Sequence, residues 1–372
     1  MEFTKKDTMA MKGIAIIMMI IHHCFFETSR YEGYNIVFAP LNERYTVIIA
    51  SFFKICVGIF VFLSGFGITK SIIKISNGRL VDKQTLKKVV FKRYIALMFG
   101  FIFVFILSQL FCWFANKGQI EIYKSNNIFN SISYFIADGL GLANLFGTPT
   151  LNGTWWYMSL AIIIVVITPL LYNLIKKYGL IITLALNIFI TQVLKVDNYD
   201  ITRWMTILIF GIYSANKSLL TQIKNCYTNT IFKKIIKFII YTALLVGAIV
   251  FREKLNYTFL EIRDGLIPMI FIGYCYEFIL PIKYVTNILQ FLGKHSMNIF
   301  LTHTFIRYYY FKDFTYSFKY SILIVLVLLG ISIIVSMVIE LLKKAIKYNE
   351  FIEFLKQKVD RKIDKNNEIR EK

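Results

Sequence analysis

Two ionisable residues, Lys12 and His23, stand eleven positions apart in an otherwise apolar stretch near the start of the chain. In an α-helix this spacing is about three turns, so both side chains project from one stripe, separated by about 16 Å along the axis. A lysine and a histidine on one face of an apolar helix are costly in lipid, so we expect that face to line a cavity. The alternative is that Lys12 extends to the headgroups and His23 hydrogen-bonds to a neighbouring helix.

A serine and another histidine lie in two further apolar segments. Ser64 belongs to the run FVFLSGFG (60–67), where no GxSxG motif surrounds the serine and the glycines favour close helix packing. Close packing therefore explains the run at least as well as a nucleophilic serine does. His303 follows the run GKHS (293–296), and a single histidine at this depth is more typical of a hydrogen-bonded core group than of a catalyst.

Basic and aromatic pairs mark the ends of two other apolar segments. Lys92 and Arg93 stand where one segment begins, which is typical of a topology signal, although such a pair could also bind a polyanion. Trp155 and Trp156 open another segment, as an aromatic belt does, although they could also stack on a sugar ring. The five cysteines show no CxxC spacing, so we predict no metal site.

These candidate residues lie in or beside apolar stretches of a length that crosses a bilayer, which takes roughly 20 residues. The chain is 57% hydrophobic, with a mean hydropathy of +0.59. The sequence predicts an all-α integral membrane protein with about ten transmembrane helices. The predicted spans are 11–27, 46–69, 90–114, 155–175, 179–195, 204–216, 235–251, 259–280, 294–310 and 320–342.

The segment 128–147 is a further apolar stretch, but it contains Asp138, Asn144 and three glycines. Irregular backbone at membrane depth is tolerated where protein or a watery cavity covers it. We therefore interpret this segment as re-entrant or interfacial.

The net charge of +21 comes from lysines and arginines that flank the apolar segments, with no basic patch interleaved with stacking aromatics. We interpret them as topology signals and expect no nucleic-acid partner. Their excess on alternate loops predicts that both termini are cytoplasmic. Residues 1–342 would form the membrane domain, and the lysine-rich tail 343–372 would be an amphipathic helix on the inner leaflet.

Taken in order, these motifs resemble the acyltransferase-3 family, membrane-bound O-acyltransferases that modify bacterial surface polysaccharides. Lys12 and His23 match its (Arg/Lys)-x10-His signature, and 60–66 resembles its FxFLSGF segment. Lys92-Arg93 resembles its basic motif, Trp155-Trp156 its tryptophan position, and 293–303 its lGkhS…fLxH segment. The family often has a second arginine where this chain has Ala96.

The resemblance implies transfer of an acyl group, usually acetyl, from cytoplasmic acyl-CoA to a hydroxyl of a glycan at the plasma (inner) membrane. Lys12, Lys92 and Arg93 would bind the CoA phosphates, and His23 would be the general base or a transient acyl carrier. Trp155, Trp156, Ser64 and His303 would contact the acceptor. No metal is implied.

Two other classes of function remain open from the sequence. A transporter or flippase of a lipid-linked glycan would also use intramembrane lysine, histidine and aromatic residues. A sensor with the same cavity would bind ligand without turnover. Consumption of acetyl-CoA in the presence of acceptor distinguishes the enzyme from both.

Overall fold

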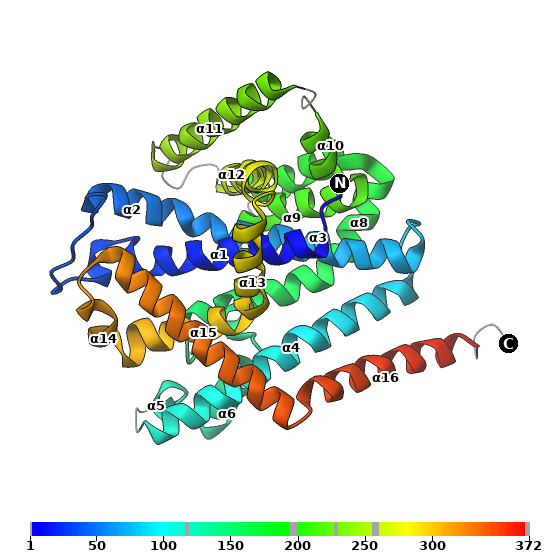
Figure 1. The fold of residues 1–372 in the computed structure, drawn as a ribbon. Helices are drawn as coiled ribbons and strands as arrows, with labels where there is room; N and C mark the ends of the chain where they lie inside the picture. Colours follow the sequence, from blue (N-terminus) through cyan, green and yellow to red (C-terminus); the bar gives the residue numbers. More distant parts are fainter. Residues whose placement is uncertain (1, 116–118, 194–198, 227–229, 255–259, 369–372) are drawn as a thin grey trace.

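Helices form nearly all of the chain that the structure, a computed structural model, describes, namely residues 2–115, 119–193, 199–226, 230–254 and 260–368 (Figure 1). Within these residues there is no strand, only an isolated bridge between Val37 and Tyr320. The all-α prediction is therefore confirmed for the described part. In chain order the helices are α1 (Lys5–Phe25), η1 (Thr28–Arg30), α2 (Glu43–Phe52), η2 (Phe53–Ile55), α3 (Cys56–Ser76), α4 (Lys83–Phe114), α5 (Gln119–Ile122), α6 (Ile128–Gly139), α7 (Ala143–Phe146), η3 (Gly153–Trp155), α8 (Trp156–Ile188), η4 (Phe189–Val193), α9 (Tyr199–Lys217), α10 (Leu219–Asn225), α11 (Ile231–Lys254), α12 (Leu260–Tyr274), η5 (Cys275–Ile279), α13 (Lys283–Thr304), η6 (Phe305–Tyr310), α14 (Lys312–Ser317), α15 (Ser321–Ala345) and α16 (Tyr348–Glu368).

Six helical segments in the described residues are long and apolar enough to cross a membrane. One of them, Gly153–Thr191, contains the predicted span 155–175 and most of the predicted span 179–195, whose last two residues lie outside the described residues. Gly179 adopts a φ of 83° and bends α8 between the two. The six segments are Lys5–Phe25, Glu43–Ser76, Lys83–Phe114, Gly153–Thr191, Ile231–Arg252 and Ser321–Ala345.

Three other predicted spans coincide with α9, with α12 and η5, and with α13 and η6, whose helices carry buried charged residues. Arg203 of α9 donates to Asp264 of α12 at 2.5 Å, and Arg252 of α11 donates to the same carboxylate. Charged groups at membrane depth are tolerated when they face the protein interior and pair there. The charged residues of these helices are therefore accommodated in the protein interior.

The segment predicted to be re-entrant forms α6 and α7. Helix α6 has 12 residues, about 18 Å, which is too short to cross a hydrocarbon core of about 30 Å. Phe129 and Ile132 are exposed on α6, whereas the buried Asp138 accepts hydrogen bonds from the Tyr123 hydroxyl (2.6 Å) and the Leu151 amide (2.7 Å). This arrangement fits a helix that lies at the interface without spanning.

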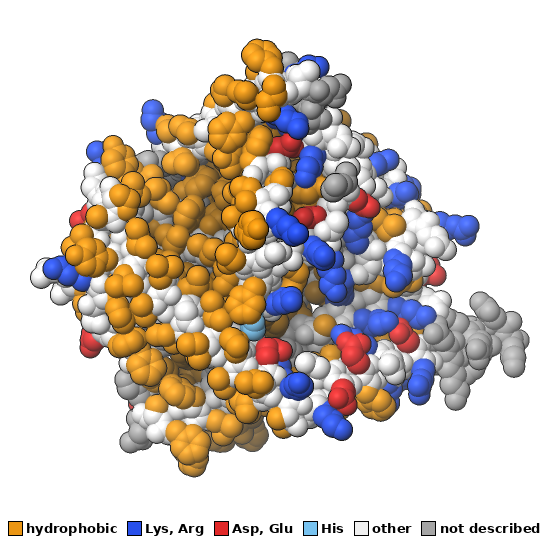
Figure 2. All heavy atoms as spheres, viewed as in Figure 1, with side chains coloured by type: hydrophobic (Ala, Val, Ile, Leu, Met, Phe, Trp, Pro, Cys, Tyr) orange, Lys and Arg blue, Asp and Glu red, His pale blue; other side chains and the backbone are white. Residues whose placement is uncertain are grey.

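The surface divides into an apolar and a cationic part. Figure 2 shows a broad band of exposed hydrophobic side chains on the left and centre of the molecule, and lysines and arginines gathered on the right. The N-terminal end of α1 and the helix α16 lie on that cationic side (Figure 1). Helix α16 packs along α4, and Asp360 of α16 forms a salt bridge with Lys92 of α4, with 2.6 Å between Lys92 Nζ and Asp360 Oδ2.

Helix α1 is central and packs against α13. Two glycines make this contact close: a Cβ on Gly13 would lie 2.1 Å from the Leu289 carbonyl oxygen, and one on Gly293 would lie 1.8 Å from that of Met9. Each Cα–Cβ bond tilts toward its own helix N-terminus, so each glycine meets the residue one turn before the other glycine. Ten residues farther along both helices, His23 and His303 are in contact.

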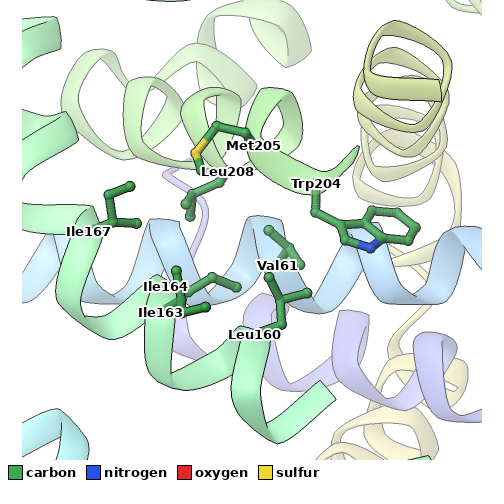
Figure 3. A pocket seen from close by; sticks show the side chains of 8 residues that line it. All are labelled: Val61, Leu160, Ile163, Ile164, Ile167, Trp204, Met205 and Leu208. Carbon is green, nitrogen blue, oxygen red and sulfur yellow. The ribbon is translucent and has the colours of Figure 1, made fainter. Parts of the chain in front are cut away.

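The region between α3, α8 and α9 is filled by apolar side chains. Figure 3 shows Val61, Leu160 and Trp204 facing one another around a gap of about 10 Å³, at most the space of one water molecule. Gly65 allows this close packing, because a Cβ there would lie 2.7 Å from Leu208, whereas nothing lies near Gly67. The predicted role of glycine in this run is therefore confirmed for Gly65 only.

Candidate functional site

A cavity of about 950 Å³ lies among α1, α3, α4, α8, α9, α13 and η6. Four of the residues singled out in the sequence line it: Lys12, His23, Ser64 and Trp156. The stripe predicted to face a cavity therefore does so. Lys12 and His23 mark two depths of this cavity, about 16 Å apart along α1.

At one end of the cavity, two cations lie close together. Arg93 of α4 is near enough to Lys12 to interact with it electrostatically, and its guanidinium donates to the Gly67 carbonyl oxygen at 3.0 Å and to Ser71 Oγ. Among the described residues, neither cation has a carboxylate within ion-pair distance. Two like charges at this depth repel each other, so their arrangement favours the binding of an anion between them.

Lys92, the neighbour of Arg93, points elsewhere. It pairs with Asp360 of α16 and does not line the cavity. Adjacent residues on a helix differ in direction by about 100°, which explains why only one of the two faces α3 and α1.

At the depth of His23, two histidines from different helices meet. The rings of His23 and His303 have centroids 5.0 Å apart, and Nδ1 of His23 is buried without a hydrogen-bond partner. His22 also lines the cavity, but its Nδ1 contacts the Ala50 carbonyl oxygen of α2 at 2.7 Å. Both histidines of α1 therefore face the cavity, and His23 is the one that also contacts His303.

His303 is held in one tautomer. Its Nδ1 faces the carbonyl oxygens of Ile299 (3.1 Å) and Phe300 (2.9 Å), which can only accept, so Nδ1 carries the proton. Its Nε2 then accepts from the Thr304 hydroxyl at 3.2 Å, and this hydroxyl lies 3.3 Å from that of Thr154. His303 is a fixed, buried partner of His23 and is not itself a lining residue.

The two tryptophans have different positions. Trp155 is buried in the apolar core and donates its indole N–H to the Leu301 carbonyl oxygen at 3.0 Å, whereas Trp156 lines the cavity. Ser64 and Tyr157 also line the cavity. Of this group, Trp156, Ser64 and Tyr157 are in reach of a ligand.

Four further cations line the cavity and were not singled out as site residues by the sequence: Arg30, Lys54, Arg203 and Arg307. A signal for Arg307 exists in the sequence, because it lies inside the predicted span 294–310, one helical turn after His303. An ionisable residue within a span is a candidate functional residue by default.

Within the described ranges, no group of three or more His, Cys, Asp or Glu side chains is arranged to hold a metal ion. The residues that line the cavity include imidazole, hydroxyl, ammonium and guanidinium groups. These groups suit proton transfer at a hydroxyl and the binding of oxyanions.

Comparison with protein families identifies the chain. A family model described as an acyltransferase domain matches residues 9–341, which include most of α1, all of α13 and most of α15. No curated protein and no solved structure matches the sequence. The match spans the whole cavity and most of the 372 residues, and the chain therefore belongs to the acyltransferase-3 family of membrane acyltransferases.

Proposed function

We propose that this protein transfers an acyl group, most simply acetyl, from cytoplasmic acyl-CoA to a hydroxyl group of a cell-surface or lipid-linked glycan. The observation that carries the proposal is the single cavity that extends from Lys12, with Arg93 beside it, to His23. Lys12 and His23 are separated by about 16 Å along α1, a distance that suits the extended pantetheine arm of CoA. The family match supports the acyl-transfer chemistry.

In the proposed orientation, both termini are cytoplasmic and about ten helices span the plasma membrane. The gathering of cations at the end that contains the N-terminus and α16 supports it. Lys12 and Arg93 would then bind the CoA phosphates from the cytoplasmic side, and His23 would lie toward the outer side. Residues 343–372 would remain outside the membrane domain on the inner leaflet.

In the proposed reaction, the acceptor hydroxyl oxygen attacks the thioester carbonyl carbon. His23 removes the hydroxyl proton as the new C–O bond forms. The C–S bond then breaks and CoA leaves as the thiolate. His23 passes the proton that it took from the hydroxyl to the thiolate sulfur of CoA. The alternative route has two steps: an imidazole nitrogen of His23 takes the acyl group with release of CoA, and the acceptor hydroxyl then displaces His23.

The test uses the purified protein in lipid nanodiscs with radiolabelled acetyl-CoA and envelope glycans extracted from cells that lack the gene. We expect glycan labelling and an equal release of free CoA. His23→Gln should lower the rate roughly 10²- to 10⁴-fold, the usual contribution of a general base, without loss of CoA binding. His22→Gln is the matched control, because glutamine can keep the contact with Ala50.

Three outcomes would count against this function or refine it. A His23→Gln protein with the wild-type rate would remove His23 from the mechanism. Movement of a lipid-linked glycan across the bilayer without CoA release would favour the transporter alternative. An acetyl adduct on His23 that accumulates when acceptor is left out would select the two-step route.

A further inference from the structure

The outer part of the cavity is strongly cationic. Its wall includes Arg30, Lys54, Arg203 and Arg307, whereas Glu27 is the one carboxylate among the described lining residues. Glu27 pairs with Arg30 at 3.0 Å. Behind the wall, the buried Asp264 is shared by three guanidinium groups, those of Arg203, Arg252 and Arg263. The positive potential of this region therefore exceeds what its carboxylates neutralise, and it favours an anionic ligand.

Arg307 of this wall has two guanidinium nitrogens for which the described residues offer no hydrogen-bond acceptor. Its side chain is only 1% exposed, yet its Nε and Nη1 atoms have no hydrogen-bond acceptor. These two nitrogens carry three N–H donors. A buried guanidinium with unsatisfied donors destabilises a protein unless a ligand completes its hydrogen bonds.

The position of Arg307 is fixed from the opposite side. Its guanidinium lies beside the Tyr316 hydroxyl, which donates to the Cys24 carbonyl oxygen at 3.1 Å. Cys24 follows His23 in α1, so this chain ties the guanidinium to the end of the helix that carries His23. Arg307 also interacts electrostatically with both His23 and His303.

We propose that the acyl acceptor carries an acidic group, phosphoryl or carboxylate, and that Arg307 binds this group while the acceptor hydroxyl faces His23. The two acids share the chemistry that Arg307 recognises, namely oxygen atoms with negative charge that accept several N–H bonds. Arg30, Lys54 and Arg203 attract the same ligand through their field. That the ligand is the acyl acceptor rests on the proposed function. That the ligand is acidic rests on Arg307 alone.

The first experiment measures binding. The melting temperature of the protein in nanodiscs is recorded with glucose, glucose 1-phosphate and glucuronate. The acidic sugars should stabilise the wild type and glucose should not, and the relative size of the two shifts assigns phosphoryl or carboxylate. In Arg307→Met the apparent Kd for the acidic sugar should rise about ten- to hundred-fold, the value of charge-assisted hydrogen bonds.

Two variants serve as controls. Arg44→Met removes an exposed arginine of α2 that does not line the cavity, and it should leave the Kd unchanged. Arg307→Lys keeps the charge and should recover part of the affinity. Without ligand, Arg307→Met should melt no lower than the wild type, because it removes an unsatisfied buried charge, whereas loss of a purely structural arginine would lower the melting temperature.

The second experiment measures transfer to acidic and neutral acceptors. Arg307→Met should raise KM for the acidic acceptor and change its kcat little. An equal loss of kcat with acidic and neutral acceptors would assign Arg307 to the transition state and overturn the proposal, as would an unchanged Kd for the acidic sugars. Binding of acidic sugars that depends on Arg307, in a protein that never releases CoA, would instead refute the proposed acyl transfer, and would leave Arg307 as a binding site for an acidic ligand that is not an acyl acceptor.

Discussion

At the residue scale, Lys12 lines one end of the cavity, and Arg93 beside it forms with it a pair of cations that no carboxylate of the described residues neutralises. If they bind the CoA phosphates, Lys12→Met or Arg93→Met should raise KM for acetyl-CoA about tenfold or more, since each charge-assisted hydrogen bond contributes roughly 1.5–3 kcal/mol. The increase should shrink at high salt, because screening weakens the same interaction in the wild type. Steady-state kinetics at two ionic strengths measures both effects.

Lys92→Met is the matched control for this prediction. It removes an adjacent cation that pairs with Asp360 away from the cavity, so KM for acetyl-CoA should stay near the wild-type value. If Lys92→Met and Arg93→Met raised KM for acetyl-CoA equally, only the net charge near Lys12 would matter. Specific binding of the CoA phosphates by Arg93 would then be excluded.

At the element scale, the close contact of α1 and α13 controls how His23 and His303 meet. Gly293→Ala would place a Cβ 1.8 Å from the Met9 carbonyl oxygen, so the two helices must separate. We expect a loss of about 1–3 kcal/mol in stability, as in other overpacked contacts, and a reduced kcat because the histidine pair moves with the helices. Thermal unfolding in nanodiscs and the turnover number measure these two consequences.

Gly330→Ala in α15 is the control, because nothing lies within 4 Å of a Cβ at that position. Alanine is the better helix former, so this variant should melt at the same temperature as the wild type or higher. A Gly293→Ala protein that behaves like Gly330→Ala would show that the α1–α13 contact can relax without consequence.

At the scale of the whole molecule, the cysteines allow the orientation to be tested without new labels. Cys226, after α10, is exposed, whereas Cys24, Cys56, Cys112 and Cys275 are buried. The proposed topology puts Cys226 in the cytoplasm. A membrane-impermeant maleimide should therefore label the protein in inverted vesicles and leave it unlabelled in intact cells.

The complementary variant is Leu41→Cys combined with Cys226→Ser. Leu41 is exposed in the segment between α1 and α2, on the opposite side in the proposed topology. This protein should be labelled in intact cells. The reverse pattern in the two proteins would invert the topology and, with it, the direction of the proposed transfer.

The sequence alone determined much of the helical framework and part of the site. Apolar stretches predicted the helices because a bilayer demands about 20 apolar residues in an element that satisfies its own backbone. Helical periodicity predicted that Lys12 and His23 share a stripe, since that relation lies within one element and depends only on 3.6 residues per turn.

Relations between elements required the tertiary structure. No local pattern says that His303 of α13 meets His23 of α1, that Arg93 faces Lys12 while Lys92 turns to Asp360, or that Trp156 lines the cavity and Trp155 does not. The same holds for Arg307, because only the packed helices show that two of its nitrogens have no hydrogen-bond acceptor among the described residues. The physical reason is that burial and pairing are sums over neighbours far apart in the chain, whereas periodicity and hydropathy are properties of consecutive residues.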